Sequence, residues 1–132
     1  MTREIRDNLL KVTKALPETA ETVYTDEIDL GAGEKVAGMD LLISAPALAV
    51  GELGDGDTMT YEVQTDSDPL FLYPRIVIPA ALVQEGADGA GAAAATRRFA
   101  LPSDADQYVR VAVTADGAND AADKSVTLEV LL

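Results

Sequence analysis

Acidic side chains come nearest, in type and spacing, to residues that could do chemistry in this chain. Asp55 and Asp57 lie in a Gly-Asp-Gly-Asp turn, and an EF-hand calcium loop starting at Asp55 would end at Asp66. That loop needs an acid or amide where Met59 stands, a Gly where Thr60 stands and a Glu in place of Asp66. The motif fails, and only a looser calcium site built from Asp55, Asp57, Asp66 or Asp68 stays open. Turn geometry is the commoner role of such residues, so we expect no metal.

Catalysis by a nucleophile or by a general base finds little support in the sequence. The chain has no His and no Cys, which removes the usual base near neutral pH and the thiolate nucleophile. Residues 31–35 resemble a phosphate loop only superficially, because Glu34 and Val36 replace the required Gly and hydroxyl residue. Paired carboxylates for glycoside hydrolysis stay open, although aromatic residues that would line such a cleft are scarce. We expect no enzymatic activity and no cofactor.

Two short stretches carry residues typical of protein interfaces. Phe71, Tyr73 and Arg75 alternate on one face of a predicted strand, and Tyr and Arg are enriched in interface hot spots. The competing interpretation is that the aromatic rings close one end of a core. Arg97 and Arg98 are the second candidate, because adjacent cations in an acidic chain are suited to pairing with acids of a neighbouring subunit. We favour the alternative for this pair, a solvated position on an edge strand.

The elements that must position these residues are β-strands. Residues 108–117 alternate between Val109, Val111 and Val113 on one face and mostly polar residues on the other, and residues 125–132 repeat the pattern. We predict that these two runs pair as an antiparallel hairpin. Residues 58–65 and 95–101 predict further strands, and residues 86–95 predict a surface loop.

The remaining segments are short and interrupted by Gly, Pro and Asp. Residues 8–13 predict a strand, with a helix over residues 3–15 as the competing interpretation, and residues 22–30 predict another strand. Residues 39–50 are apolar, but Pro46 predicts a bend or an edge position. Residues 70–79 predict a short strand or an extended edge. The sum is an all-β antiparallel sandwich, jelly-roll-like, with seven to eight strands. We expect one domain over residues 1–132, with residues 1–7 as an N-terminal arm.

The charge balance restricts the partners of the chain. Ten Lys and Arg stand against 23 Asp and Glu, which gives a net charge of −13. A field of this sign repels phosphate backbones and anionic lipid surfaces, so we expect neither a nucleic-acid nor a membrane partner. The charge also fits a role in solubility or docking onto a basic protein surface. The charged N-terminus has no apolar core of signal-peptide length, and no apolar run reaches membrane-spanning length, so we expect a chain made in a cytoplasm.

Several segments in order resemble the jelly-roll cement, or decoration, proteins of tailed-bacteriophage capsids, and most of all the Bordetella-phage cement-protein family. The similarity lies in Arg-Asp-Asn-Leu-Leu at residues 6–10 and Thr-Asp-Glu-Ile-Asp-Leu-Gly at residues 25–31. It continues in Arg-Phe-Ala-Leu-Pro at residues 98–102, an acidic turn, Gln-Tyr-Val-Arg-Val-Ala-Val-Thr at residues 107–114, and a last strand. The match spans most of the chain in order and spacing.

This resemblance implies a structural protein of the virion. It would be made in the host cytoplasm, bind the outer surface of a phage head through the major capsid protein and bridge neighbouring capsomers to stabilise the shell. It would act as a homo-oligomer, with a dimer favoured and a trimer as the alternative. Open strand edges are suited to pairing across subunits.

Three other interpretations compete with this one. A glycan- or receptor-binding β-sandwich module on a virion would need an aromatic platform, for which Tyr24, Tyr61, Phe71 and Tyr73 are the candidates. A small hydrolase using carboxylates is disfavoured by the absence of His and Trp. A sandwich domain adapted to high salt would fold only where salt screens the repulsion among its acids.

Overall fold

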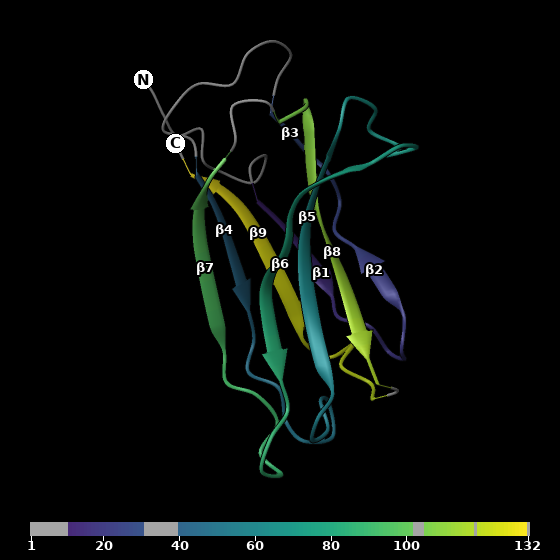
Figure 1. The fold of residues 1–132 in the computed structure, drawn as a ribbon, viewed down its shortest axis with the longest axis vertical. Helices are drawn as coiled ribbons and strands as arrows, with labels where there is room; N and C mark the ends of the chain where they lie inside the picture. Colours follow the sequence, from purple (N-terminus) through teal and green to yellow (C-terminus); the bar gives the residue numbers. More distant parts are fainter. Residues whose placement is uncertain (1–10, 31–39, 102–104, 118, 132) are drawn as a thin grey trace.

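The computed structural model describes residues 11–30, 40–101, 105–117 and 119–131 of the chain. These residues contain no helix, and therefore none long and apolar enough to cross a membrane. They form two antiparallel β-sheets that face each other as the layers of a sandwich (Figure 1). The predicted all-β antiparallel sandwich is confirmed.

Nine strands make up the two sheets in the described part of the chain. One sheet has the order β1-β9-β4-β7, and the other has the order β2-β8-β5-β6 with β3 paired to β8 beside β2. The strands are β1 (Lys11–Ala15), β2 (Thr22–Tyr24), β3 (Ile28–Asp29), β4 (Asp40–Ala45), β5 (Thr58–Asp66), β6 (Arg75–Glu85), β7 (Ala95–Ala100), β8 (Tyr108–Asp116) and β9 (Ser125–Leu131).

The strand order is that of a jelly roll. β2 and β3 both pair with β8, so together they fill the place of one strand and leave two four-stranded layers. Almost every connection crosses from one sheet to the other; among the described strands, only β5 and β6 are consecutive, antiparallel neighbours joined as a hairpin. The β5–β6 loop (residues 67–74) is therefore the tip of that hairpin and extends from one end of the sandwich (Figure 1).

Alternation along the central strands builds the core between the sheets. Val109, Val111 and Val113 of β8 are fully buried, and the residues between them point to the outer face of their sheet. β5, β4 and β9 contribute in the same way. Their buried side chains are Leu41, Ile43, Met59, Tyr61, Val63, Val126, Leu128 and Val130. Valine, leucine and isoleucine thus supply most of the core, which agrees with an aromatic content of only 5%.

A hydrogen-bond network of Tyr61 and Gln84 lies inside this core and links the two sheets. The buried Tyr61 hydroxyl donates to Gln84 Oε1 at 2.6 Å, and Gln84 Nε2 donates to the carbonyl oxygens of Pro46 at 2.8 Å and Ala93 at 3.0 Å. Burial raises the pKa of Tyr61, so its phenol stays protonated as the donor. Pro46 and Ala93 flank β4 and β7, which belong to the opposite sheet.

The predicted hairpin between residues 108–117 and 125–132 is wrong. β8 and β9 are strands with the predicted alternation, but they lie in different sheets, where β8 pairs with β5 and β9 with β4. The chain between them crosses the sandwich. Their alternation shows that each strand has one buried face, and says nothing about which strand lies beside it.

Other predicted strands differ in their bounds. The strand over residues 22–30 is split into β2 and β3, which raises the count from the predicted seven to eight strands to nine. β4 ends before Pro46, and it lies between β9 and β7 rather than at an edge. β6 is an edge strand as predicted, yet it begins only at Arg75 and continues through Pro79. Pro79 is tolerated there because an edge strand has no neighbour on one side.

The N-terminal predictions are tested only in part. Residues 11–15 form strand β1 rather than the end of a helix. The predicted arm over residues 1–7 lies outside the described residues.

Candidate functional site

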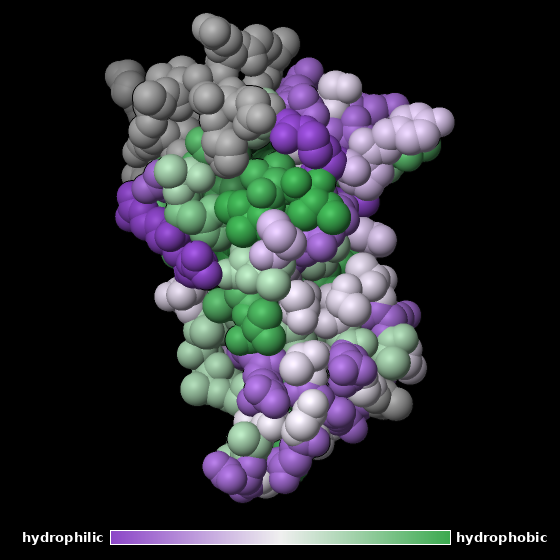
Figure 2. Space-filling view, in the orientation of Figure 1, coloured by the Kyte–Doolittle hydropathy of each residue, from purple (hydrophilic) through white to green (hydrophobic). Residues whose placement is uncertain are grey.

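Exposed apolar side chains gather on one sheet and on the loop that extends from it. Seven large apolar residues are exposed in the described part of the chain, and six of them belong to the β2-β8-β5-β6 sheet or the β5–β6 loop. Figure 2 shows apolar side chains in the area of β6 on the face turned to the viewer. The six are Tyr24, Leu70, Leu72, Tyr73, Ile76 and Val83; the seventh, Val50, follows β4.

The β5–β6 loop presents the most exposed members of this set. Leu70, Leu72 and Tyr73 are 73%, 62% and 88% exposed. Water-exposed apolar side chains in three of four consecutive positions are unfavourable in an isolated protein, because each would be more stable by about 1.5–3 kcal/mol if fully buried. The loop is therefore a candidate contact region.

Two carboxylates fix the shape of this loop from within. Asp66 accepts hydrogen bonds from the backbone N–H of Asp68 and of Tyr73, both at 3.1 Å, and so closes the base of the loop. Asp68 Oδ1 accepts the N–H of Leu70 at 2.9 Å, and its backbone carbonyl accepts the N–H of Phe71 at 2.9 Å. These bonds hold the backbone in place while the apolar side chains stay outside.

Phe71 anchors the loop to the sheet at a cost in backbone strain. Its φ of 51° lies in the left-handed region, which is unfavourable for a bulky residue. This turn sends the Phe71 ring inward, where it is 5% exposed, between two outward-facing leucines. The Phe71 ring centroid lies 4.1 Å from Cζ of Arg110 in β8. The strained backbone at Phe71 thus lets one loop bury a phenylalanine ring against the sheet while its leucines stay exposed to solvent.

Arg110 lies between two aromatic rings. The Tyr24 ring centroid is 4.0 Å from its Cζ, and Tyr24 belongs to β2 on one side of β8, whereas Phe71 reaches Arg110 from the β5 side. Arg110 Nε donates to Gln64 Oε1 at 2.9 Å, and Gln64 Nε2 donates to Glu62 Oε2 at 2.8 Å. Partial burial lowers the pKa of Arg110, while attraction to Tyr24, Asp66 and Glu27 opposes this effect. An arginine remains charged under such conditions.

The predicted interface residues have different roles in the structure. The prediction that Phe71, Tyr73 and Arg75 share one strand face is wrong, because residues 67–74 are a loop and β6 begins at Arg75. The Phe71 ring is buried against Arg110, Tyr73 is exposed, and Arg75 Nη2 lies 3.8 Å from Asp106 Oδ2. All three are nevertheless at the same end of the sandwich, and contact with a partner stays a prediction.

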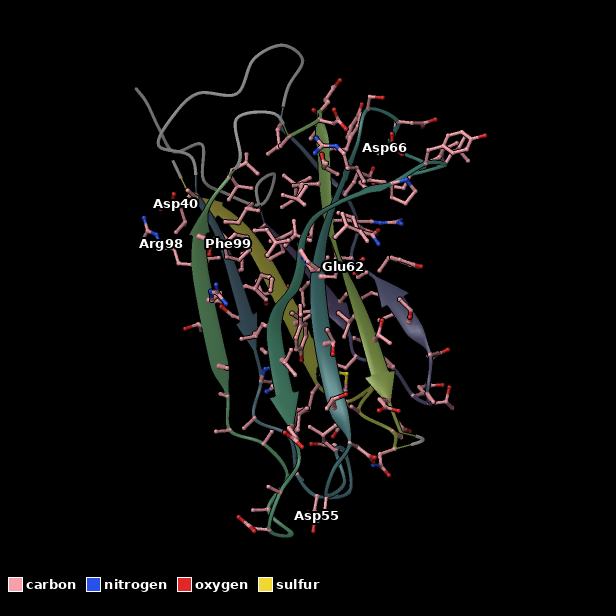
Figure 3. The ribbon with its side chains drawn as sticks, in the orientation of Figure 1. Asp40, Asp55, Glu62, Asp66, Arg98 and Phe99 are labelled. Atoms are coloured by element: carbon pink, nitrogen blue, oxygen red, sulfur yellow. The ribbon has the colours of Figure 1, made fainter. Side chains whose placement is uncertain are left out.

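Arg97 and Arg98 lie on an edge strand, as predicted, but do not act as a pair. Arg97 Nη1 donates to the carbonyl of Ala81 in β6 at 2.9 Å and so links the edges of the two sheets. Arg98 Nε binds Asp40 Oδ2 at 2.8 Å on the outer face, where Figure 3 shows the two side chains beside each other. A contact with a neighbouring subunit stays a prediction for both.

The four aspartates considered for calcium do not form one site. Asp55 precedes β5 and Asp66 is its last residue, so the two lie at opposite ends of the sandwich (Figure 3). Asp68 accompanies Asp66, and Asp57 accompanies Asp55. In the described ranges, no three acidic side chains come together as ligands. The spacing in the sequence does not bring these residues together, because the length of β5 separates the two pairs.

Apart from Arg110, the groups with shifted pKa values in the described part of the chain lie away from the β5–β6 loop. Tyr61 is enclosed in the core. Glu52 pairs with Lys124 at the opposite end from the β5–β6 loop, with its Oε1 2.7 Å from Lys124 Nζ. Groups with shifted pKa values often mark catalytic sites when they share a cleft, but these two have separate structural partners. The exposed loop and the Arg110 stack therefore form the candidate site.

The sequence analysis missed Arg110, Leu70 and Leu72. Arg110 looked like an ordinary polar position of an alternating strand, and its ring partners come from distant segments. Leu70 and Leu72 had a usable signal, since they flank an aromatic residue between Pro69 and Pro74. A short apolar run between two prolines is more typical of a loop than of a strand.

Comparison with known proteins gives little beyond the fold. No protein-family model and no curated protein sequence matches the chain. Among solved structures, the chain is similar to one described as "xylan-binding module CBM15", with a TM-score of 0.41 and 12% identity over 97% of this chain and 94% of that chain. Similarity at this level has no bearing on function. Of the resemblance to phage cement proteins, what the structure bears out is the jelly-roll sandwich.

Proposed function

We propose that this chain is a non-catalytic structural module that docks onto the surface of another protein through the β5–β6 loop. The observation that carries the proposal is the organisation of that loop. Two aspartates and a strained phenylalanine hold Leu70, Leu72 and Tyr73 in exposed positions. A loop with no binding role would more simply carry polar residues.

Preorganisation supports docking energetically. Ordering a flexible loop on binding costs conformational free energy, about 0.5–1.5 kcal/mol for each immobilised side chain, in addition to the backbone. Here the backbone is already fixed by bonds inside the loop. Two leucines and a tyrosine that enter an apolar pocket would therefore contribute most of their transfer free energy to affinity.

The resemblance to capsid cement proteins suggests the partner. We propose that the docking surface is an assembled phage shell, that the major capsid protein supplies the pocket, and that the module bridges neighbouring capsomers on the outside of the head. A homo-oligomer, dimeric in preference to trimeric, would present several loops at once and raise the overall affinity. The acidic body suits a position outside the packaged DNA.

Co-sedimentation with shells tests this proposal. The purified chain is mixed with empty expanded heads of the phage that encodes it, and bound protein is measured in the pellet across a range of concentrations. We expect saturable binding, and heads that resist heat better when the chain is bound. A chain that stays in the supernatant at every concentration, with no change in head stability, would refute the capsid role.

Glycan binding is the second candidate, and the exposed Tyr73 ring is the observation that favours it. A tyrosine that is 88% exposed on a rigid loop is able to stack on a sugar ring. A glycan array probed with the chain and with Tyr73→Ala checks this function. Specific signals that disappear in the variant would favour a glycan module over a protein-docking one.

A further inference from the structure

Arg110 is held in the outer face of the β2-β8-β5-β6 sheet with part of its hydrogen-bonding capacity unused. A guanidinium carries five N–H donors in one rigid plane. The Nε donor of Arg110 is used by Gln64. Among the residues that the structure describes, Arg110 makes no ion pair and donates no further hydrogen bond, so its two Nη groups have no protein acceptor.

This situation is unusual in a chain with a net charge of −13. Other cations form ion pairs with carboxylates. Arg98 Nε lies 2.8 Å from Asp40 Oδ2, and Lys124 Nζ lies 2.7 Å from Glu52 Oε1. Arg110 instead has aromatic rings and an amide as its nearest neighbours. The carboxylates of Asp66 and Glu27 attract Arg110 only from beyond ion-pair distance, so a carboxylate from outside would be its first close charged partner among the described residues.

The surroundings of Arg110 fix the direction in which it can bind. The rings of Tyr24 and Phe71 cover the guanidinium, and Gln64 holds the Nε edge. Gln64 is itself oriented by Glu62, which accepts from its Nε2 at 2.8 Å. What remains is the edge formed by the two Nη groups, and this edge matches the two oxygens of a carboxylate.

Arg110 is also next to the docking loop. Phe71, which packs on the guanidinium, lies between Leu70 and Leu72 in the chain. A partner that received the exposed leucines would therefore bring its own side chains close to Arg110. Charge pairing beside an apolar contact is the usual arrangement at the rim of an interface.

We propose that Arg110 is a carboxylate-binding site whose occupant is an acidic side chain of the protein onto which the β5–β6 loop docks. The identity of the occupant rests on the proposed docking function. A protein carboxylate is favoured over a sugar acid because the rings of Tyr24 and Phe71 stack on the guanidinium itself, and the exposed leucines beside Phe71 suit an apolar protein pocket. The acid would bind through both oxygens to the Nη edge while the leucines enter an apolar pocket.

Acetate is the probe that tests the site without the partner. The labelled chain is titrated with sodium acetate at constant ionic strength, with sodium chloride as the reference salt, and the arginine side-chain N–H resonances are followed by NMR. We expect the Arg110 resonances to shift and to saturate, while those of Arg98 do not. Arg110→Lys keeps the charge but loses the fork, so acetate binding should weaken about tenfold, and Arg98→Lys should leave it unchanged.

A second variant guards against a folding defect in Arg110→Lys. Tyr24→Leu removes one of the two rings and leaves the guanidinium in place, so acetate should bind a few-fold more weakly to a chain that retains Arg110. No saturable shift at Arg110, or equal shifts with acetate and chloride, would overturn the proposal.

Three further outcomes test the proposed occupant and separate this inference from the proposed function. Glucuronate that binds far more tightly than acetate would overturn the assignment of a protein carboxylate and point to a sugar acid. Failure of the acetate titration, combined with shell binding that depends on the β5–β6 loop, would refute the Arg110 site alone. Acetate binding without any shell binding would instead refute the docking function and the proposed occupant.

Discussion

The two ends of the sandwich use similar residues for opposite purposes. At the β5–β6 loop, Asp66 and Asp68 bind N–H groups of their own loop. At the far end (residues 49–57, 86–92 and 119–124), carboxylates reach across to other loops, as Asp55 does to the N–H of Gly89 at 2.8 Å and Asp57 to the Asn119 amide at 3.0 Å. The first pattern shapes one isolated loop, and the second joins three loops into one unit.

This difference indicates that the far end stabilises the fold and that the β5–β6 loop exposes apolar side chains. Polar side chains of the far end bind one another's loops, and Val50 is its one large apolar residue with substantial exposure in the described ranges. The β5–β6 loop contacts the body through Phe71 and leaves its apolar residues outside. Substitutions at the far end should therefore change the free energy of unfolding, and substitutions at the exposed loop positions should change docking.

The largest effect on unfolding is expected at Gly91. Its φ is 69°, and a Cβ at this position would overlap the carbonyl oxygen of Leu48. Gly91→Ala should therefore lower the free energy of unfolding by about 3 kcal/mol, from backbone strain and steric overlap together. Urea denaturation measures this loss.

Two other glycines of the far end serve as matched controls. Gly89 has a φ of 66° with open space around it, so Gly89→Ala should cost about 1 kcal/mol from strain alone. Gly51 has neither restriction, and Gly51→Ala should be nearly neutral. Equal losses at all three positions would contradict the tight contact between these loops.

The second largest effect is expected on docking, and only from substitutions in the β5–β6 loop. Leu72→Ser and Tyr73→Ala should each weaken binding to shells about thirtyfold, the effect of a hot-spot residue worth about 2 kcal/mol. Their urea midpoints should not change, because both side chains are exposed. Val50→Ser removes a comparable exposed side chain at the far end and should bind like the original chain. Equal weakening by Val50→Ser would show that the two ends do not differ in function.

Strain at Phe71 predicts an inverted order of two variants. Both Phe71→Ala and Phe71→Gly lose the ring that packs on Arg110. Glycine adopts a φ of 51° without strain, whereas alanine does not. Phe71→Gly should therefore be more stable than Phe71→Ala by about 1 kcal/mol, the reverse of the usual order within a strand. A more stable alanine variant would show that the left-handed turn imposes no strain.

Local alternation was enough to predict much of the fold. β5 and β8 have nearly the predicted bounds, because the inward and outward positions of a half-buried strand carry apolar and polar residues in alternation. The pairing of β8 with β5 rather than β9 was not predictable in this way. Strand neighbours depend on how the whole chain crosses between sheets, and every alternating strand offers the same local signal.

The candidate site was predictable only as a region. Aromatic content singled out Phe71 and Tyr73, yet one lies inside and the other outside, because the left-handed φ at Phe71 breaks the alternation that a strand would have. The Arg110 stack joins β2, β8 and the β5–β6 loop. Contacts among three distant segments leave no pattern in a single sequence.

The smallest effect on the free energy of unfolding is expected at Glu52, and this effect depends on pH. Hydrogen bonds from Lys124, then from the Ala49 N–H, lower the pKa of Glu52 from 4.5 to about 2. A lowered carboxyl pKa stabilises the folded state above the unfolded-state value, and this contribution is lost as the pH falls from about 4.5 towards 2. Glu52→Gln should unfold at slightly lower urea concentration at neutral pH, and its urea midpoint should equal that of the original chain near pH 2.

Glu85→Gln is the control variant, because it removes an exposed carboxylate on β6 and reports the effect of charge alone. A difference between Glu52→Gln and the original chain that persists unchanged to pH 2 would show that the bond to Lys124 does not hold the far end together.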